Sequence, residues 1–307
     1  MSMVERPFLV PGMSNDARIR VYRRVFAPEE DQQEKMEVDS YVVVTTRYVV
    51  VLDTLLCPED MAAIMNEMRK EIIGRELLVV NSHADWDHCW GNNYFTGNRK
   101  ATILAHDYCV TRMQSDEAKA GLQEYQNKYS YFQNVTLISP TITFSDRLTI
   151  HGGDLTIELF SAPGHHPDHI AAWIPEIHLL LAFDGAEKPL PLIGDVDGIQ
   201  PMYNTLQRFI ALHPQRVLCA HGKTTDITIV MQNLHYMREI EQRSRALLTT
   251  HRPTDSELEH AATLIHYSFN DVVETQSDIT DADREFYTWA HENNVAYILR
   301  WLMHKQD

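Results

Sequence analysis

Short apolar runs separated by polar breaks dominate the chain up to residue 225. Two β-branched runs flank a polar break at residues 40–53, which predicts a β-hairpin. Apolar side chains then recur at helical spacing from Met61 to Ile72, and Gly74 is placed to end that helix. The same patterns predict strands at 77–80, 148–150, 154–160, 169–174, 178–183 and 216–220. They predict helices at 106–128 and 203–212. Strand-rich halves interrupted by helices predict an α/β layered sandwich.

The pattern changes to a purely helical one after Asp226. Apolar stripes at helical spacing are formed by Ile227, Val230, Met231, Leu234 and Met237, and by Val295, Ile298, Leu299 and Leu302. We therefore expect a sandwich over residues 1–225 and a helical extension over 226–307 that packs on it. The extension could be a structural cap, a surface for homo-oligomer formation or a lid over a site, and the pattern leaves these alternatives open.

The composition is typical of a globular protein, with 44% hydrophobic and 23% charged residues. There are 27 Lys and Arg against 43 Asp and Glu, so the formal net charge is −16. A general nucleic-acid binder needs a basic surface, so this charge argues against nucleic acid as a partner. The 16 histidines are the first indication of metal or proton chemistry.

The chain shows no targeting or membrane pattern. An acid and a base interrupt the start, MSMVERPFLVPGM, where a signal peptide has its apolar region. No uninterrupted apolar run approaches the roughly 18 residues of a membrane span. The four cysteines are far apart and form no C-x-x-C, which favours neither disulfides nor a thiolate zinc site. We expect a cytoplasmic protein without a membrane partner.

Residue types that bind metals follow four of the predicted strands. The segment HADWDH at 83–88 offers four potential ligands within six residues, and a loop can wrap these around a pair of metals. His165 follows another strand in the sequence APGH, Asp184 follows the run at 178–183, and His221 precedes a glycine after 216–220. Acids and histidines buried together are costly without a cation. Asp53, at the end of the hairpin, is expected to support the site.

These motifs resemble those of the metallo-β-lactamase-fold superfamily, which carries H-x-H-x-D-H, P-G-H-T, an Asp after an apolar strand and a late His-Gly, in that order. The resemblance covers residues 38–225. It implies a four-layer αββα sandwich with a dinuclear metal site at one edge of the two sheets. It also implies a ligand set: metal 1 on His83, Asp85 and His165, metal 2 on Asp87, His88 and His221, and Asp184 as the bridge.

The chain departs from the family pattern at two places. Asp85 stands where most members have His, and Ala182-Phe183 replaces the usual small residues before the bridging acid. A third carboxylate favours Mn²⁺ or Fe²⁺ over Zn²⁺, although zinc also accepts carboxylate oxygens. The expected cofactors are therefore two divalent ions, Zn, Mn or Fe, with a bias towards the last two.

The resemblance implies a metal-dependent hydrolase. A metal-bridging hydroxide would attack an ester, thioester, lactone, lactam or phosphoester of a small-molecule substrate. Asp87 would orient the nucleophile or shuttle its proton. Lys188 and Lys223 follow site loops and could pair with an anionic substrate, although a solvated lysine is the commoner outcome. At least one of His166 and His169 would orient a ligand.

Two other functions stay open. Flavodiiron proteins of the same superfamily have Glu where Asp85 stands and use two irons as oxidoreductases, but the chain lacks the strand–glycine loop–helix pattern of their flavodoxin-like domain after residue 225. A non-catalytic, ligand-binding member of the fold would be supported by a set of metal ligands in which a position is lost, and none of the seven positions is lost.

Cys89, beside His88, is expected to be a buried inert thiol. Trp86 and Trp90 would either wall a pocket or pack in the core.

Overall fold

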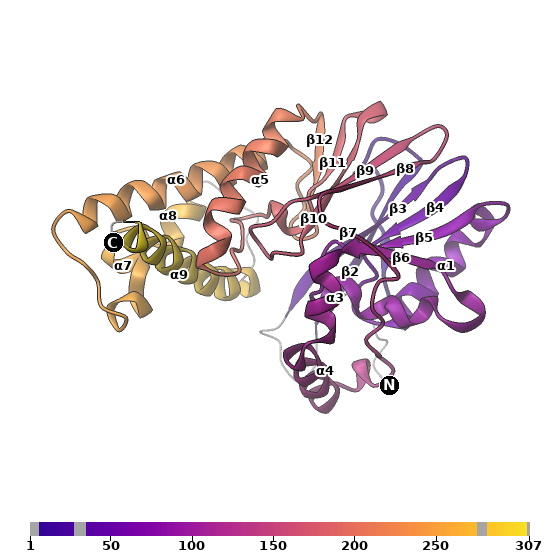
Figure 1. Cartoon of the computed structure of the whole chain (residues 1–307), viewed down its shortest axis with the longest axis horizontal. Coiled ribbons are helices and arrows are strands. Elements are labelled where there is room, and N and C mark those ends of the chain that lie inside the picture. The colour runs from indigo at the N-terminus through magenta and orange to yellow at the C-terminus, as the bar shows by residue number, and fades with distance from the viewer. Residues whose placement is uncertain (1–5, 28–34, 275–280, 306–307) are drawn as a thin grey trace.

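The first sheet of the sandwich has seven strands in the order β1 to β7 (Figure 1). The structure is a computed structural model that describes residues 6–27, 35–274 and 281–305. The strands are β1 (Phe8–Leu9), β2 (Ile19–Phe26), β3 (Met36–Val44), β4 (Tyr48–Leu52), β5 (Glu76–Val80), β6 (Thr102–His106) and β7 (Ile142–Phe144). The first four pair antiparallel, and β4 to β7 pair parallel. The hairpin predicted at 40–53 is β3–β4.

The second sheet separates two hydrophobic cores. Its order is β12-β11-β10-β9-β8, and its strands are β8 (Arg147–His151), β9 (Thr156–Ser161), β10 (Ile170–Ile174), β11 (Leu179–Leu181) and β12 (Arg216–Leu218). Successive strand residues point to opposite faces. Leu159 and Leu181 accordingly join the core shared with the first sheet, whereas Phe160 and Leu180 join the core shared with the later helices.

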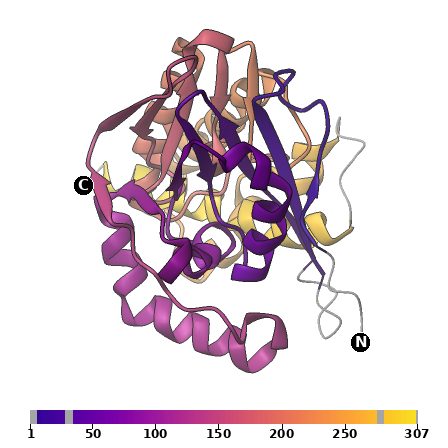
Figure 2. The same ribbon diagram turned by 90° about the vertical axis from the view of Figure 1, so that its right-hand side faces the viewer.

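Helices cover the outer side of each sheet. The first sheet is accompanied by α1 (Pro58–Ile72), the short α2 (Trp86–Cys89), α3 (Asp107–Gln114) and α4 (Asp116–Lys128). The second sheet packs on α5 (Ile199–Ala211) and on the helices that follow it. Figure 2 looks from the side of α1, with the C-terminal helices behind the two sheets. The αββα architecture with a helical extension is therefore confirmed.

The extension contains α6 (Thr228–Leu248), α7 (Ala261–Leu264), α8 (Phe269–Val273) and α9 (Asp281–His304). The α6 and α9 helices pack against each other, and α5 packs against α6. Val230, Leu234 and Met237 are buried as predicted, but Met231 is 57% exposed because adjacent helix residues lie about 100° apart around the axis. Within the described residues, no helix has the length and apolar character needed to cross a membrane.

Several predicted elements have different bounds in the structure, and the helix predicted at 106–128 is divided at Ser115 into α3 and α4 because Ser115 caps the start of α4. The strand predicted at 178–183 ends at Leu181, because the chain turns through a 3₁₀ segment, Phe183–Gly185, in which Phe183 adopts a left-handed φ of 48°. The strand predicted at 216–220 ends at Leu218. The helix predicted at 203–212 begins earlier, at Ile199. Strands β1, β2, β6 and β7 were not predicted, because short or mixed polar runs hide their alternation.

Candidate metal centre

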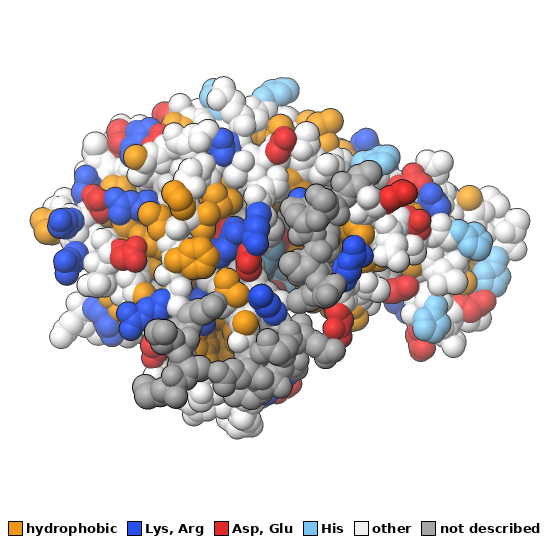
Figure 3. All heavy atoms as spheres, turned by 180° about the vertical axis from the view of Figure 1, so that it is seen from behind, with side chains coloured by type: hydrophobic (Ala, Val, Ile, Leu, Met, Phe, Trp, Pro, Cys, Tyr) orange, Lys and Arg blue, Asp and Glu red, His pale blue; other side chains and the backbone are white. Residues whose placement is uncertain are grey.

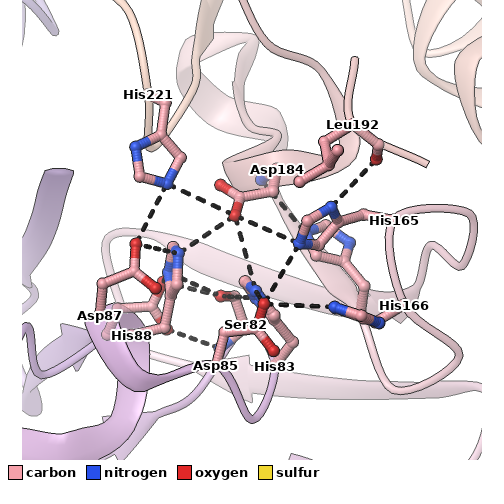
Figure 4. A network of polar contacts seen from close by, with 12 residues as sticks. Ser82, His83, Asp85, Asp87, His88, His165, His166, Asp184, Leu192 and His221 are labelled. Atoms are coloured by element: carbon pink, nitrogen blue, oxygen red, sulfur yellow. Dashed lines mark hydrogen bonds and ion pairs between the residues drawn. The ribbon is translucent and has the colours of Figure 1, made fainter. Parts of the chain in front are cut away.

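All seven predicted ligands meet at one edge of the two sheets (Figure 4). The loop after β5 and the short α2 bring His83, Asp85, Asp87 and His88 from one side. His165 from the loop before β10, Asp184 after β11 and His221 after β12 approach from the other side. We call His83, Asp85 and His165 half-site 1, and Asp87, His88 and His221 half-site 2; Asp184 lies between them. Within each half-site the ligand atoms lie within 4.8 Å of one another.

Each of the four histidines is anchored through Nδ1, which leaves Nε2 towards the centre. The Nδ1 partners are Ser82 Oγ for His83 at 2.9 Å, Asp53 Oδ2 for His88 at 2.8 Å, the Leu192 carbonyl for His165 at 3.0 Å and the Glu37 carbonyl for His221 at 2.8 Å. Metal-binding histidines are held in this way by oxygen acceptors that fix the ring and its tautomer.

The inward-facing atoms have the spacing of a coordination shell. The Nε2 atoms of His83, His88, His165 and His221 lie 3.5, 3.1, 3.6 and 3.6 Å from Asp184 Oδ2. Metal–ligand bonds of roughly 2.0–2.2 Å place neighbouring ligand atoms about 3.0–3.6 Å apart. The Nε2 atoms of His83, His88 and His165 and Asp184 Oδ1 are buried without a hydrogen-bond partner. Orphaned buried polar atoms are costly, so this donor set fits divalent cations.

The two acids of the HADWDH loop also point inward. Asp85 occupies the N-cap position of α2, but its side chain makes no capping hydrogen bond. Instead, Asp85 Oδ2 lies 3.4 Å from His83 Nε2 and 3.5 Å from His165 Nε2. In the first turn of the helix, Asp87 Oδ2 lies 3.3 Å from His88 Nε2 and 3.2 Å from His221 Nε2. The start of α2 therefore gives one carboxylate to each half-site.

Three further predicted residues lie behind or beside these ligands. Asp53 accepts hydrogen bonds from the backbone N–H and the hydroxyl of Ser82 in addition to its contact with His88. His169 donates from Nδ1 to the Ala162 carbonyl, and its Nε2 accepts the backbone N–H of Asp184. Burial holds the pKa of His169 well below its usual value, so this ring is neutral and able to accept. His166 lies closer to the ligands, with Nε2 3.2 Å from Asp85 Oδ2.

The glycine of the APGH motif is required by packing. Gly164 has a φ of +144°, and a Cβ built on it would lie 2.6 Å from the Met202 Cα of α5. No other residue fits this approach of the loop to the helix. The loop can therefore pass close to α5 and bring His165 to the centre.

Comparisons with known proteins identify the family. A sequence model of the metallo-β-lactamase superfamily matches residues 35–221, more than half of the chain. The chain belongs to the metallo-β-lactamase superfamily. No curated protein sequence matches the chain.

Solved metallo-β-lactamases share the fold. DIM-1 exposed to ceftazidime is 18% identical with a TM-score of 0.58, over 76% of this chain and 97% of that one. A metallo-β-lactamase from Pontibacter korlensis is 13% identical with a TM-score of 0.58, over 75% and 98%. The mono-zinc form of FIM-1 from Pseudomonas aeruginosa is 15% identical with a TM-score of 0.56, over 75% and 94%.

The electrostatics of this metallo-β-lactamase-fold centre favour cations. The Asp184 carboxyl is buried, but His88 and His221 hold its pKa well below the usual range. Burial lowers the pKa of His165, whereas Asp85 and Asp184 outweigh burial and raise it to about 9. Carboxylates similarly raise the pKa of His88 and His221. Without metal these imidazoles hold protons, which divalent ions must displace on binding.

Sequence reasoning missed Glu187, a carboxylate beside half-site 1. Its oxygen lies within 4.8 Å of ligand atoms of His165 and Asp184, and the residue is 2% exposed. Tyr287 of α9 donates a hydrogen bond to Glu187 Oε2 at 3.1 Å, and the side-chain amide of Asn233 in α6 bonds both backbone groups of Glu187. Burial and the Asp184 charge raise the pKa of Glu187 to about 7. In the sequence, an acid beside a lysine resembles an ordinary surface turn.

The predicted substrate contacts receive uneven structural support. Lys223 is 60% exposed and pairs with Glu37. Lys188 is half-buried and its Cβ lies near Gly222, beside His221.

Trp86 and Trp90 pack in an aromatic cluster: the Trp86 ring centroid lies 5.0 Å from that of Tyr125, and the Trp90 centroid lies 5.3 Å from that of Phe132. Cys89 is buried, and burial raises the pKa of its thiol well above the usual value, as an inert thiol requires.

Proposed function

We propose that this chain is a dinuclear metal-dependent hydrolase that acts on a small-molecule ester, thioester, lactone, lactam or phosphoester. The observation that carries the proposal is the convergence of four Nδ1-anchored imidazoles on Asp184, with three of their Nε2 atoms buried and unpartnered. Bound divalent ions would acidify a water molecule and stabilise negative charge on the substrate. The superfamily assignment and the candidate metal ligands support hydrolysis.

The carboxylates around this centre would divide the remaining work. Asp184 would join the two half-sites and keep their ligands at a fixed separation. Asp87 would orient the attacking water or shuttle its proton, because the residue is buried and its Oδ2 lies within 3.3 Å of two imidazoles. Glu187 would be a second acceptor on the side of half-site 1. These roles need no serine or cysteine nucleophile.

The donor set favours hard metal ions. Asp85, Asp87 and Asp184 supply three carboxylates, and Glu187 places a fourth within reach. Oxygen-rich sites favour Mn²⁺ and Fe²⁺ more than histidine-rich sites do. Protein produced without added zinc should therefore contain substantial iron or manganese by elemental analysis. Two equivalents of tightly held zinc under every growth condition would contradict this bias.

The surface supports a small substrate more than a nucleic acid. On the face shown in Figure 3, Lys and Arg side chains are scattered among acidic and hydrophobic ones. The net charge of −16 would repel a polyanion at long range.

The test compares substrate classes across metals. Chelated protein is reloaded with Zn²⁺, Mn²⁺ or Fe²⁺ and assayed with p-nitrophenyl esters, a thioester, a lactone, a β-lactam and a phosphodiester. We expect one class to be turned over well above the others, and His165→Gln to abolish that turnover. His106→Gln is the matched control, because His106 is buried and its ring nitrogens bond the Ser145 carbonyl and the Tyr108 N–H rather than a residue of either half-site. No turnover with any metal, together with oxygen consumption by the iron form, would favour the oxidoreductase instead.

A further inference from the structure

A carboxylate–guanidinium–carboxylate chain lies directly behind half-site 1. Arg112 of α3 donates from one terminal nitrogen to Asp85 Oδ1 and from the other to Asp168 Oδ1, each at 2.6 Å. Asp168 is fully buried, and its second oxygen accepts the backbone N–H of Ala84 at 2.8 Å. Both arms of the guanidinium are therefore occupied, and its position is set from the buried side.

The contacts of Asp85 divide cleanly between its two oxygens. Oδ1 faces Arg112, whereas Oδ2 faces the Nε2 atoms of His83, His165 and His166 at 3.2–3.5 Å. A free carboxylate beside a metal ion can bind through one oxygen or both. An arginine that holds one oxygen in a short, charge-assisted hydrogen bond leaves the other oxygen alone to face the cation.

The same loop is braced in a parallel way on the other half-site. Asp53 is also fully buried, accepts a backbone N–H of this loop, from Ser82, and orients His88 directly. Asp168 accepts the Ala84 N–H two residues later and reaches Asp85 through Arg112. Each half-site thus has one buried aspartate that fixes one ligand, and in half-site 1 the arginine spans the added distance.

We propose that Arg112, held by Asp168, is a positioning residue that makes Asp85 a one-oxygen ligand of the metal in half-site 1. The proposal rests on the proposed metal centre. It assigns Arg112 to the metal site, because each terminal nitrogen already donates to a carboxylate, one of which is the candidate ligand Asp85. Without Arg112, Asp85 would be free to rotate, either away from the cation or so that both oxygens face it. The coordination number of that metal would then change, and its affinity would fall because one ligand would no longer be held in place.

A double-mutant cycle tests the proposal. Wild type, Arg112→Gln, Asp85→His and the double variant are chelated and titrated with Co²⁺, which gives two binding constants and a visible spectrum that reports coordination geometry. We expect Arg112→Gln to weaken one of the two binding events by about 10–100-fold and to change the spectrum. With His at position 85 the same change should alter affinity by less than about threefold, because Arg112 then has no ligand to orient.

Control variants separate positioning from folding. Arg112→Lys keeps the charge without the two-armed geometry and should give an intermediate affinity; Asp168→Asn should act in the same direction. Arg20→Gln removes an arginine of equal exposure that pairs with Glu71 away from the centre, and should leave both constants unchanged. If Arg112→Gln weakens metal binding equally with Asp and with His at position 85, the proposal is overturned, since Arg112 would then only hold the loop. A wild-type chain that binds no Co²⁺ would overturn the proposed function as well, whereas two tight sites unaffected by Arg112→Gln would overturn only this inference.

Discussion

The two half-sites have the same ligand types but different supports. Each has two histidines and one aspartate and shares Asp184. In half-site 2, both histidines are held by the first sheet and its edge: His88 by Asp53, which follows β4, and His221 by the Glu37 carbonyl of β3. These supports come from the central, regular part of the sandwich.

Half-site 1 depends on parts of the chain outside the sheets. Asp85 is held by Arg112 of α3, and His165 by the Leu192 carbonyl. Asn294 of α9 in turn bonds the residues on either side of Leu192. Half-site 2 is therefore fixed by the sandwich, whereas two of the three residues of half-site 1, Asp85 and His165, rely on α3 and on a loop that the C-terminal extension holds. We expect the metal in half-site 1 to be the one that responds to changes elsewhere in the molecule.

Loss of Asp184 should weaken metal binding at both half-sites, whatever the supports of their other residues. Asp184→Asn keeps the shape but loses the charge that all four imidazoles face. Both metals should bind weakly, and turnover should fall by about 10³-fold or more, because both water activation and charge stabilisation are lost. Elemental analysis after gel filtration and the substrate assay provide the measurements. Retention of two metals with more than a tenth of wild-type turnover would show that Asp184 does not join the half-sites.

Asp53→Asn should affect half-site 2 more than half-site 1, because Asp53 contacts His88 directly but reaches His83 through Ser82 Oγ. Asp53 has a left-handed φ of 65°, which asparagine tolerates, so the backbone should be preserved. Loss of the charge behind His88 should weaken one binding event by about 10–100-fold and the other by a smaller factor. Competition with a chromophoric chelator resolves the two constants. The matched control is Asp60→Asn, a buried aspartate that pairs with Arg24 instead. Equal weakening of both binding events would contradict the difference in support between the half-sites.

The contrast between the supports of the two half-sites also explains which features of the molecule the sequence could predict. The strand ends and the ligand motifs are local patterns, so the αββα fold, the family and the meeting of seven residues at one edge were predictable. Asp53 was also recognisable, because it ends a strand next to the HADWDH loop in the expected sheet.

The supports of half-site 1 left no such local signal. Arg112 lies in a polar helix and resembles a solvated arginine, and only the docking of α3 brings it to Asp85, 27 residues away in sequence. Glu187 meets Asn233 and Tyr287, which are 46 and 100 residues further along. The contacts of Glu187 depend on how the extension packs, which the periodicity of the sequence does not specify. Phe183 is a third case, because its left-handed turn aims Asp184 at the centre where the pattern predicts continued strand.

Asn294→Ala tests whether the extension supports half-site 1. Asn294 is fully buried, and its amide bonds the Ile193 N–H and the Pro191 carbonyl. The alanine leaves both backbone groups unpaired, so the free energy of unfolding should fall by about 2–4 kcal/mol. The loosened Leu192 carbonyl should also weaken metal binding at half-site 1 several-fold. Half-site 2 in the same protein is the internal control. Equal loss at both half-sites would mean that the extension acts on the whole fold.

The smallest effect concerns the pH dependence of the metal-free protein. The pKa of His165 is raised to about 9 and that of Glu187 to about 7, both above the values of roughly 6.5 and 4.3 in an unfolded chain. A group that binds its proton more tightly when folded stabilises the protein below its unfolded pKa, and this contribution is lost as pH rises through the folded pKa.

In excess chelator, urea denaturation should therefore show the free energy of unfolding falling from pH 5 to pH 9. Glu187→Gln should flatten the lower part of this window and His165→Gln the upper part, each by on the order of 1–2 kcal/mol. Metal-loaded protein should show the opposite slope, because its imidazoles must be deprotonated. A chelated protein whose stability rises over the same range would show that these two groups are not held as the structure places them.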